Sequence, residues 1–400
     1  MNKVDRWLLP DGIEDMLPNE AMALEALRRQ LVDVFQGWGY DYVIPPLVEF
    51  TDSLFTGAGS DVELGTFKIT DQISGKTMGI RADITPQAAR MDAHSMHRKG
   101  VNRLCYAGHV LHTRSKSLLG SRAPVQLGVE LFGVSSIQAD IEVISLLVES
   151  LRAAGLEKIY LDLGHVSVYR AIVAEAGFSA DQEQACFELL QAKSATELGR
   201  WLEQTVDDTT IRNWLLQLPK LSGGRAVLDT ARQVYRGAPA AIEAALQQID
   251  ELAAVVVRRY PEVQLYFDLS ELRGYHYHTG LVFGAFSPGV GEAIANGGRY
   301  DEVGRAFGNA RPATGFNIDL SAVARIVQPP VMTKRGIFAP MSNNPEQWRK
   351  IQALRLDGER VVGGLDGQTK ALDYQVCDRI LVERDGEFAV QPIPSKHIQE

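Results

Sequence analysis

The segment Val125–Gly133 reads VQLGVELFG, and its pattern decides the predicted fold. Strand alternation places on one face the side chains of Gln126, Gly128, Glu130 and Phe132. A buried carboxylate is costly without a partner, so Glu130 needs a protein cation or a ligand donor. Two interpretations are equally open: the two acceptors line a pocket, or the segment is an edge strand whose polar face meets water.

The neighbouring segments predict a large domain built on an antiparallel sheet. VNRLCYAGHVL at 101–111 and KIYLDLG at 158–164 are rich in strand-forming residues. Asn19–Trp38 carries apolar residues at helical spacing, and two strand-like runs in Phe67–Asp83 flank a turn, which predicts a hairpin. A helix is expected from about Asp140 to Ala154.

Two further parts of the chain have a different character. Residues 178–258 are rich in Ala, Leu, Gln and Glu, which predicts a helical insertion between sheet-forming parts. Pro329 and Pro330 mark a linker, and the segment after them predicts a small α/β domain. The predicted fold class is α+β, with one domain at 1–325 and a second at 331–400.

Composition bounds the classes of function. The chain has 400 residues, 45% of them hydrophobic, and a formal net charge of −9. An acidic chain has no general positive field for nucleic acid, although a local basic patch stays compatible with this charge. No apolar run is long enough to cross a bilayer, and acids and prolines interrupt the N-terminal region, so a cytoplasmic location is expected. The three cysteines, Cys105, Cys186 and Cys377, lack the paired spacing of a zinc site.

A second group of polar residues lies in IRADITPQAAR at 80–90. Alternation predicts that Arg81, Asp83 and Thr85 share one face, where a carboxylate and a hydroxyl could hold a ligand ammonium. The alternative, which this segment alone favours, is a surface salt bridge with Thr85 capping a helix that runs toward His97.

A third group lies in ELRGYHYHTGLVF at 271–283. Arg273 can clamp a carboxylate with two hydrogen bonds, and Tyr275 and Tyr277 supply flat walls with a polar end. His276 and His278 could bind zinc, but no third ligand follows at a useful spacing, so no metal is expected.

The fourth group is ANGGRYDEVGRAFG at 295–308. Gly297 and Gly298 precede Arg299 and Tyr300, which predicts a tight turn at the wall of a pocket. No phosphate-binding glycine spacing accompanies them.

Together and in this order, ITPQAAR, QLGVELFG, RGYHYHTG and GGRYDEVGRAFG resemble the signatures of class II histidyl-tRNA synthetases over about residues 5–325. The resemblance implies the class II antiparallel sheet flanked by helices, and a histidine pocket. Its implied histidine-binding residues are Asp83, Thr85, Gln126, Glu130, Arg273, Tyr277, His278 and Tyr300. Tyr277 and His278 both stand where that family has tyrosines. By this resemblance Arg273 holds the carboxylate, Asp83, Thr85 and Gln126 hold the ammonium, and Glu130 with the tyrosines contacts the imidazole or the ammonium.

The ATP half of the family's site departs from the pattern. Synthetase chemistry needs cations over the phosphates of ATP. The position of the motif 2 arginine falls on His112, its neighbouring acid on Arg114, and the motif 3 arginine on Ala322. A neutral imidazole and a methyl group cannot replace two guanidinium groups. Arg114 or Arg325 could compensate only if the loops shift.

The string RGYHYHTG, with a short tail that is not basic, resembles the regulatory subunits of ATP phosphoribosyltransferase more than a true synthetase. This resemblance implies a subunit without catalytic residues or cofactors that binds L-histidine, does not bind tRNA, and mediates feedback inhibition and activation of a short-form catalytic subunit. A homodimer is expected because Tyr40–Phe50 resembles the class II dimer segment, and the resemblance to the regulatory subunits implies that this dimer lies within a hetero-octamer. The rivals are a divergent histidyl-tRNA synthetase and a tRNA-binding accessory factor. LDGQTK at 365–370 is interpreted as a turn and not as a phosphoribosyl-binding loop.

Overall fold

The computed structural model describes residues 7–56, 60–96, 98–115, 120–275, 277–308, 310–327, 335–365 and 377–393. The chain divides into two compact units, Met1–Pro329 and Pro330–Glu400. They are called unit 1 and unit 2 below.

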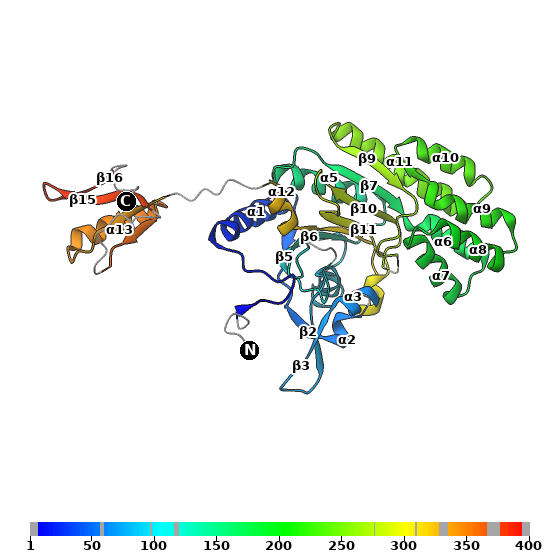
Figure 1. The fold of residues 1–400 in the computed structure, drawn as a ribbon, viewed down its shortest axis with the longest axis horizontal. Coiled ribbons are helices and arrows are strands. Elements are labelled where there is room, and N and C mark those ends of the chain that lie inside the picture. Colours follow the sequence, from blue (N-terminus) through cyan, green and yellow to red (C-terminus); the bar gives the residue numbers. More distant parts are fainter. Residues whose placement is uncertain are drawn as a thin grey trace. The chain divides into compact units, whose positions relative to one another are not determined.

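Unit 1 is built on a sheet in which nine strands pair within the described residues (Figure 1). In spatial order the strands are β1 (Asp41–Tyr42), β5 (Asn102–His109), β6 (Val125–Phe132), β12 (Ala313–Asp319), β11 (Ala295–Arg299), β10 (Leu281–Phe286), β7 (Tyr160–His165), β9 (Gln264–Asp268) and β8 (Ser222–Gly223). Most neighbours are antiparallel, as predicted, while β1 with β5 and β7 with β9 are parallel pairs. The centre of the sheet is therefore antiparallel and both ends are mixed.

Helices cover the sheet around one large apolar core. The helix α1 (Pro18–Gly37) buries the stripe Leu27, Leu31 and Phe35, which recurs at the helical spacing read from the sequence. It packs on α5 (Ile137–Ala153), α12 (Leu320–Val327) and β5. The predicted helices at 19–38 and 140–154 are thus confirmed, with small shifts at their ends.

The predicted helical insertion is also confirmed, and it gathers at one end of unit 1 (Figure 1, green). After α6 (Val166–Ala176) its elements are α7 (Ala180–Gln191), α8 (Ala195–Thr205), α9 (Thr209–Gln217), the short 3₁₀ helix η3 (Leu218–Lys220), α10 (Ala226–Val234) and α11 (Ala240–Arg259). Ser179 and Gln182 form a capping box at the start of α7, and Asp208 caps α9. Because α11 packs on α5, α6 and β7, the insertion joins the body of unit 1.

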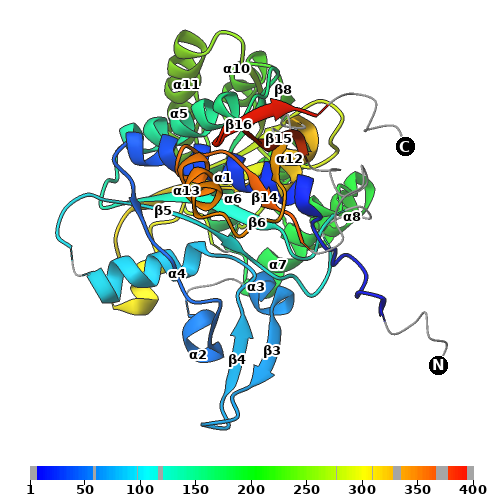
Figure 2. The ribbon, with the colours of Figure 1, turned by 90° about the vertical axis from the view of Figure 1, so that its left-hand side faces the viewer.

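A smaller three-stranded sheet carries the predicted hairpin, which projects from unit 1 (Figure 2). Its strands are β2 (Val48–Phe50), β3 (Phe67–Thr70) and β4 (Thr77–Ile80), and the short helices α2 (Thr51–Leu54) and α3 (Ser60–Gly65) lie between β2 and β3 in the chain. The helix expected to run toward His97 begins as α4 (Thr85–Arg90) and continues as the π-helical turn η2 (Met91–Met96). His97 lies outside the described residues.

Unit 2 has its own sheet and its own core. The elements are β13 (Gly336–Ala339), α13 (Pro345–Leu356), β14 (Val361–Gly363), β15 (Cys377–Arg384) and β16 (Glu387–Pro392), and the strand order is β14-β13-β15-β16. This α/β arrangement agrees with the predicted one. Of the segment interpreted as a turn, residues 366–370 lie outside the described residues. Within the part of the chain that the structure describes, no helix is long and apolar enough to cross a membrane.

Candidate functional site

A cavity of about 170 Å³ opens over the centre of the large sheet, above β6, β11 and β12. Its lining residues come from segments far apart in the sequence: Val62, Asp83, Thr85, Pro86, Glu130, Gly274, Tyr277, His278, Asn296, Gly297, Gly298, Tyr300, Gly315, Phe316 and Asn317. All four polar segments that the sequence singled out therefore contribute to one site.

Glu130 forms the floor of this cavity. Its side chain is buried, with 1% of the residue exposed. Tyr106 donates a hydrogen bond of 3.0 Å to Oε1, and Tyr300 donates to Oε2. Burial raises the pKa of Glu130 to about 8, against the opposing effect of these donors. The edge-strand interpretation of this segment is wrong, because β6 lies between β5 and β12 and is buried along its whole length.

Asp83 forms one side of the cavity, and Gln126 lies behind it. The Asp83 carboxylate accepts hydrogen bonds from Gln126 Nε2 at 2.9 Å and from the Thr85 amide at 3.0 Å. Gln126 Oε1 accepts from the Ile84 amide at 2.8 Å. Gln126 thus orients the carboxylate without lining the cavity. Thr85 is buried, and its Oγ1 lies 3.1 Å from the Tyr106 hydroxyl. Because Tyr106 also donates to Glu130, this contact connects Thr85 to the floor of the cavity.

Arg81 does not join Asp83 and Thr85, so the predicted shared face is wrong for this residue. Its guanidinium donates to the carbonyls of His109 and Pro45, each at 2.8 Å. The space for it exists because Gly108 has no side chain, since a Cβ there would overlap Arg81 Nη2. The surface salt bridge weighed as an alternative is wrong too, because Arg81 is buried against backbone carbonyls.

The loop after β9 contributes two aromatic rings. Tyr277 stacks on Tyr300 with ring centroids 4.9 Å apart, and its buried hydroxyl makes no hydrogen bond within the described residues. His278 Nδ1 lies 3.2 Å from the Arg273 carbonyl, so this nitrogen carries the proton and donates. Burial lowers the pKa of His278 to about 4, which keeps the ring neutral and leaves Nε2 as an acceptor.

Arg273 lies beside the cavity and does not line it. Its side chain is 47% exposed and forms an ion pair with Glu271 at 2.6 Å. Arg273 Nη1 donates at 3.2 Å to Asn296, which does line the cavity. A ligand carboxylate could therefore meet this guanidinium only at the rim.

The sequence predicts no metal site in this loop. Among the residues that the structure describes, no three histidine, cysteine or acidic side chains cluster as metal ligands. His276, one of the two histidines weighed as zinc ligands, lies outside those residues.

Gly297 and Gly298 do not form the predicted tight turn. Both lie inside β11, which pairs with β10 and β12. A Cβ on Gly297 would overlap the Phe283 ring, and one on Gly298 would lie 2.7 Å from the His278 ring. The glycines are therefore required by close packing at the cavity wall and not by chain reversal.

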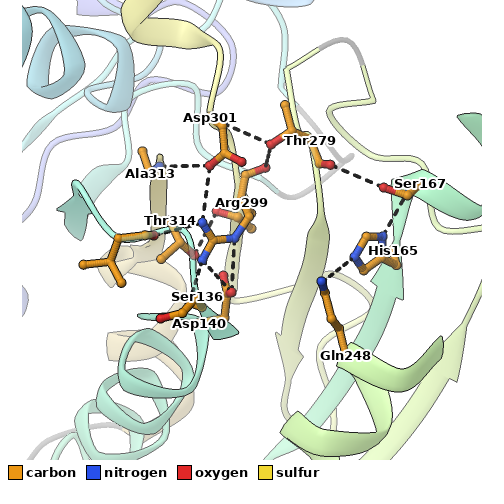
Figure 3. Close-up of polar contacts among 12 residues, drawn as sticks. Ser136, Asp140, His165, Ser167, Gln248, Thr279, Arg299, Asp301, Ala313 and Thr314 are labelled. Carbon is orange, nitrogen blue, oxygen red and sulfur yellow. Dashed lines mark hydrogen bonds and ion pairs between the residues drawn. The ribbon is translucent and has the colours of Figure 1, made fainter. Parts of the chain in front are cut away.

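Arg299, next to Tyr300, is fixed by a buried ion pair (Figure 3). Its Nη2 lies 2.6 Å from Asp140 Oδ2 on α5, and Nη1 donates to Asp301 Oδ1 at 3.3 Å. The guanidinium also donates to the carbonyls of Val134 and Ser136. Arg299 is 7% exposed. This anchor holds β11, and with it Tyr300, against the helix layer.

Sequence reasoning missed several residues of the site: Tyr106, Asn296, Phe316 and Asn317. A signal for Tyr106 was present. It pairs with Gly128 across β5 and β6, and a Cβ on Gly128 would lie 2.6 Å from its hydroxyl. A tyrosine facing a glycine across two strands indicates a ring that lies over the neighbouring strand.

By the resemblance, His112 and Ala322 are expected at the positions of the ATP-binding arginines of synthetases. His112 lies after β5, and its carbonyl accepts from Arg122 at 3.1 Å. Ala322 lies on α12. Arg114 and Arg325 are exposed and do not line the cavity.

The comparisons with known proteins agree with this geometry. The sequence model of the histidyl-tRNA synthetase family matches residues 12–323, and that of the ATP phosphoribosyltransferase subunit HisZ C-terminal domain matches residues 334–391. The fold class predicted for the chain is thereby confirmed.

Named relatives extend over the whole chain. An ATP phosphoribosyltransferase regulatory subunit of Teredinibacter turnerae is 61% identical, covering 98% of this chain and 100% of the relative. The same subunit of Saccharophagus degradans is 58% identical, again covering 98% and 100%. A crystal structure of an ATP phosphoribosyltransferase regulatory subunit/histidyl-tRNA synthetase from Bacillus halodurans has a TM-score of 0.81 at 26% identity, covering 93% of this chain and 96% of that one. The chain belongs to the family of ATP phosphoribosyltransferase regulatory subunits, whose larger unit has the histidyl-tRNA synthetase fold.

Proposed function

We propose that the cavity binds free L-histidine, and that this binding regulates a catalytic ATP phosphoribosyltransferase subunit in the cytoplasm. The observation that carries the proposal is Glu130, a buried carboxylate that keeps acceptor capacity after its two tyrosine bonds. Removing a carboxylate from water is costly, and a ligand N–H or cation offsets that cost. The relatives named as regulatory subunits support the second half of the proposal.

Histidine matches the distribution of polar groups around the cavity. Asp83 and Thr85 suit the ammonium, with Gln126 orienting the carboxylate of Asp83. The imidazole has two ring nitrogens, which Glu130 and the unbonded hydroxyl of Tyr277 can address. His278 Nε2 accepts a further ligand N–H. Tyr300 forms the flat wall under Tyr277.

Arg273 supplies the cation for the ligand carboxylate in this proposal. It is the nearest guanidinium of the loop that carries Tyr277 and His278, and Asn296 connects it to the cavity. Binding requires it to share or exchange its bond with Glu271. Arginine suits this role because its planar donors match a carboxylate in two hydrogen bonds.

Calorimetric titration tests the cavity. The full chain should bind L-histidine and bind L-histidinol, which lacks the carboxylate, more weakly. Arg273→Ala should bind both equally, because the missing guanidinium removes the preference. Arg29→Ala is the matched control, since Arg29 is an exposed arginine paired with a glutamate on α1. Absence of histidine binding at millimolar concentration contradicts the proposal.

We also propose that the chain does not catalyse aminoacylation. The support is the imidazole of His112 and the methyl of Ala322 at positions where synthetases carry arginines. Histidine-dependent exchange of pyrophosphate into ATP should be absent, with an authentic histidyl-tRNA synthetase as positive control. Exchange above background would favour the rival enzyme. Retardation of tRNA at physiological salt that weakens with added salt would favour the accessory-factor rival.

The partner in this proposal is a short-form catalytic subunit, bound to a homodimer of this chain within a hetero-octamer. Part of the segment Tyr40–Phe50 is apolar and exposed, at Ile44, Leu47 and Phe50, as expected of a surface covered by a second copy. Mixing the chain with the short catalytic subunit should raise turnover, and histidine should lower it. Unchanged turnover without co-elution contradicts the regulatory proposal, and a monomer in sedimentation contradicts the dimer.

A further inference from the structure

One tight loop between β9 and β10 faces the cavity on one side and the helical insertion on the other. The amides of Tyr277 and His278 both donate to the Gly274 carbonyl at 2.8 Å. Gly274 has φ +67, a conformation that other residues rarely adopt, and a Cβ there would lie 2.7 Å from His278 Nδ1. Tyr277 and His278 line the cavity. Tyr275, in the same turn, contacts the insertion instead.

Tyr275 is held by helices α6 and α7. Tyr275 is 3% exposed, and its ring stacks on Phe187 with centroids 5.5 Å apart and meets Tyr169 edge to face at 5.1 Å. Its hydroxyl donates to Glu183 Oε1. Arg170 lies over the ring with its guanidinium 5.0 Å from the centroid, and it donates to the Tyr275 carbonyl at 2.8 Å. The helices α6 and α7 thus hold both the side chain and the backbone of Tyr275.

The end of the same loop is attached to α6 a second time (Figure 3). Ser167 Oγ, in the first turn of α6, donates to the Thr279 carbonyl at 3.4 Å. His165 Nδ1 caps α6 by accepting from the Ser167 amide, so its other nitrogen donates to Gln248 on α11. On its other side, the Thr279 amide donates to the Arg299 carbonyl at 2.7 Å. The loop is therefore fixed between β11 and the helices α6 and α7.

We infer that Tyr275 is a positioning residue for the histidine cavity, which ties Tyr277 and His278 to helices α6 and α7. The inference rests on the proposed function of the cavity. Histidine that contacts Tyr277 and His278 restrains the loop, and through Tyr275 it restrains α7. The same coupling acts in reverse, because linkage between two sites is reciprocal. Binding of histidine in the cavity can then be detected in the insertion, on the other side of the loop.

The direct test combines calorimetry with hydrogen exchange on the full chain. Tyr275→Phe keeps the ring stack and removes the bond to Glu183. It should weaken the Kd for L-histidine about fivefold or more, the lower end of typical coupling between linked sites. Glu183→Ala should do the same, Glu183→Gln, which keeps an acceptor, should recover most of the affinity, and the double variant should be no weaker than either single one.

Tyr235→Phe is the matched control. Tyr235 is a buried tyrosine after α10 whose hydroxyl has no hydrogen-bond partner in the described part of the chain. The same kind of atom is removed, here from a tyrosine of the insertion whose hydroxyl makes no hydrogen bond, so histidine affinity should be unchanged. Circular dichroism of each variant verifies that the fold is retained.

Hydrogen exchange provides a measurement that would stay unchanged if Tyr275 had only a structural role. In the wild-type chain, histidine should slow amide exchange across α7, and this protection should be lost in Tyr275→Phe. Wild-type binding with unchanged affinity in Tyr275→Phe and no protection of α7 overturns the inference alone. Absence of histidine binding to the wild type overturns the proposed function, and the inference with it.

Discussion

The pKa of Glu130 follows from the position of this residue in the sheet. It stands on a strand buried on both sides, so desolvation raises its pKa from 4.5 to about 8. Between these two values the unfolded chain loses the proton while the folded chain keeps it. The free energy of unfolding of the wild type therefore falls as pH rises through this window, and levels off above the folded pKa.

Glu130→Gln should remove this pH dependence. The wild type should lose at least about 2 kcal/mol of stability relative to the variant between pH 5 and pH 8, because each pKa unit corresponds to roughly 1.4 kcal/mol. Denaturant unfolding at several pH values without histidine measures the difference. A constant difference across this range would mean that Glu130 is already ionised at pH 5. The variant should also bind histidine at least about tenfold more weakly, since an amide N–H replaces one of the two oxygens of Glu130 and cannot accept.

Residue patterns are most informative about the cavity lining where a polar residue stands on a regular strand. Glu130 is predictable because alternation fixes its face, whereas Tyr300 follows a segment that the pattern predicts as a turn and was named only from the resemblance. Gln126 and Arg273 were predicted as direct ligands, yet one lies behind Asp83 and the other at the rim. Sequence spacing gives the face of a strand, but the depth of a side chain depends on what packs across from it.

At the scale of elements, glycines set the depth of the cavity. Gly315 on β12 faces Glu130, and a Cβ there would overlap Oε2 and the Val129 carbonyl. Strand backbones pack closely here, so no flexible group can move aside. The hydrogen bonds from Tyr106 and Tyr300 to Glu130 therefore depend on the absence of a side chain at Gly315.

Gly315→Ala should therefore destabilise unit 1 by about 1–3 kcal/mol, the usual cost of overpacking, and should abolish histidine binding. Gly199→Ala on α8 is the control, because its new Cβ would meet only Leu216 Cδ2 at 3.9 Å. That change should be neutral or stabilising, since alanine favours helices. Thermal unfolding and calorimetry report both outcomes, and normal binding by Gly315→Ala would show that Glu130 has room to move.

The ion pair between α5 and β11 gives a second element-scale prediction. Asp140→Ala should destabilise the chain by about 3 kcal/mol, because buried Arg299 would keep only its longer 3.3 Å contact with the Asp301 carboxylate. Arg29→Ala breaks an exposed pair on α1 and should cost less than about 1 kcal/mol. Urea unfolding of both variants measures the contrast. Equal small losses would mean that water reaches Arg299.

Helices and hairpins were the most predictable elements. The stripe on α1 and the two short strands around the turn at 74–75 follow simple periodicities. The segment 295–299 was predicted as a turn because two adjacent glycines usually mark one, and yet it is a central strand. Its glycines are required because the rings of Phe283 and His278 pack directly against them. Those rings lie 14 and 20 residues away in the chain, so a local sequence pattern does not reveal them.

At the scale of the whole molecule, the two units have separate cores. The cavity is built entirely from unit 1. A chain truncated after residue 329 should fold and bind histidine within about twofold of the full chain, as expected of an independent domain. Calorimetry and circular dichroism test this. A truncated chain that folds but does not bind would assign unit 2 a role in the site.

The side chains that line the cavity are also part of what holds unit 1 together. Glu130, Thr85 and Tyr300 are buried and bonded across strands, whereas Arg114 and Arg325 are exposed. A substitution at an exposed arginine therefore removes few of the contacts that stabilise the fold. A substitution in the buried lining lowers the free energy of unfolding as well as changing the cavity, because the same contacts serve both. Selection for a stable fold by itself therefore tends to preserve the lining of the cavity.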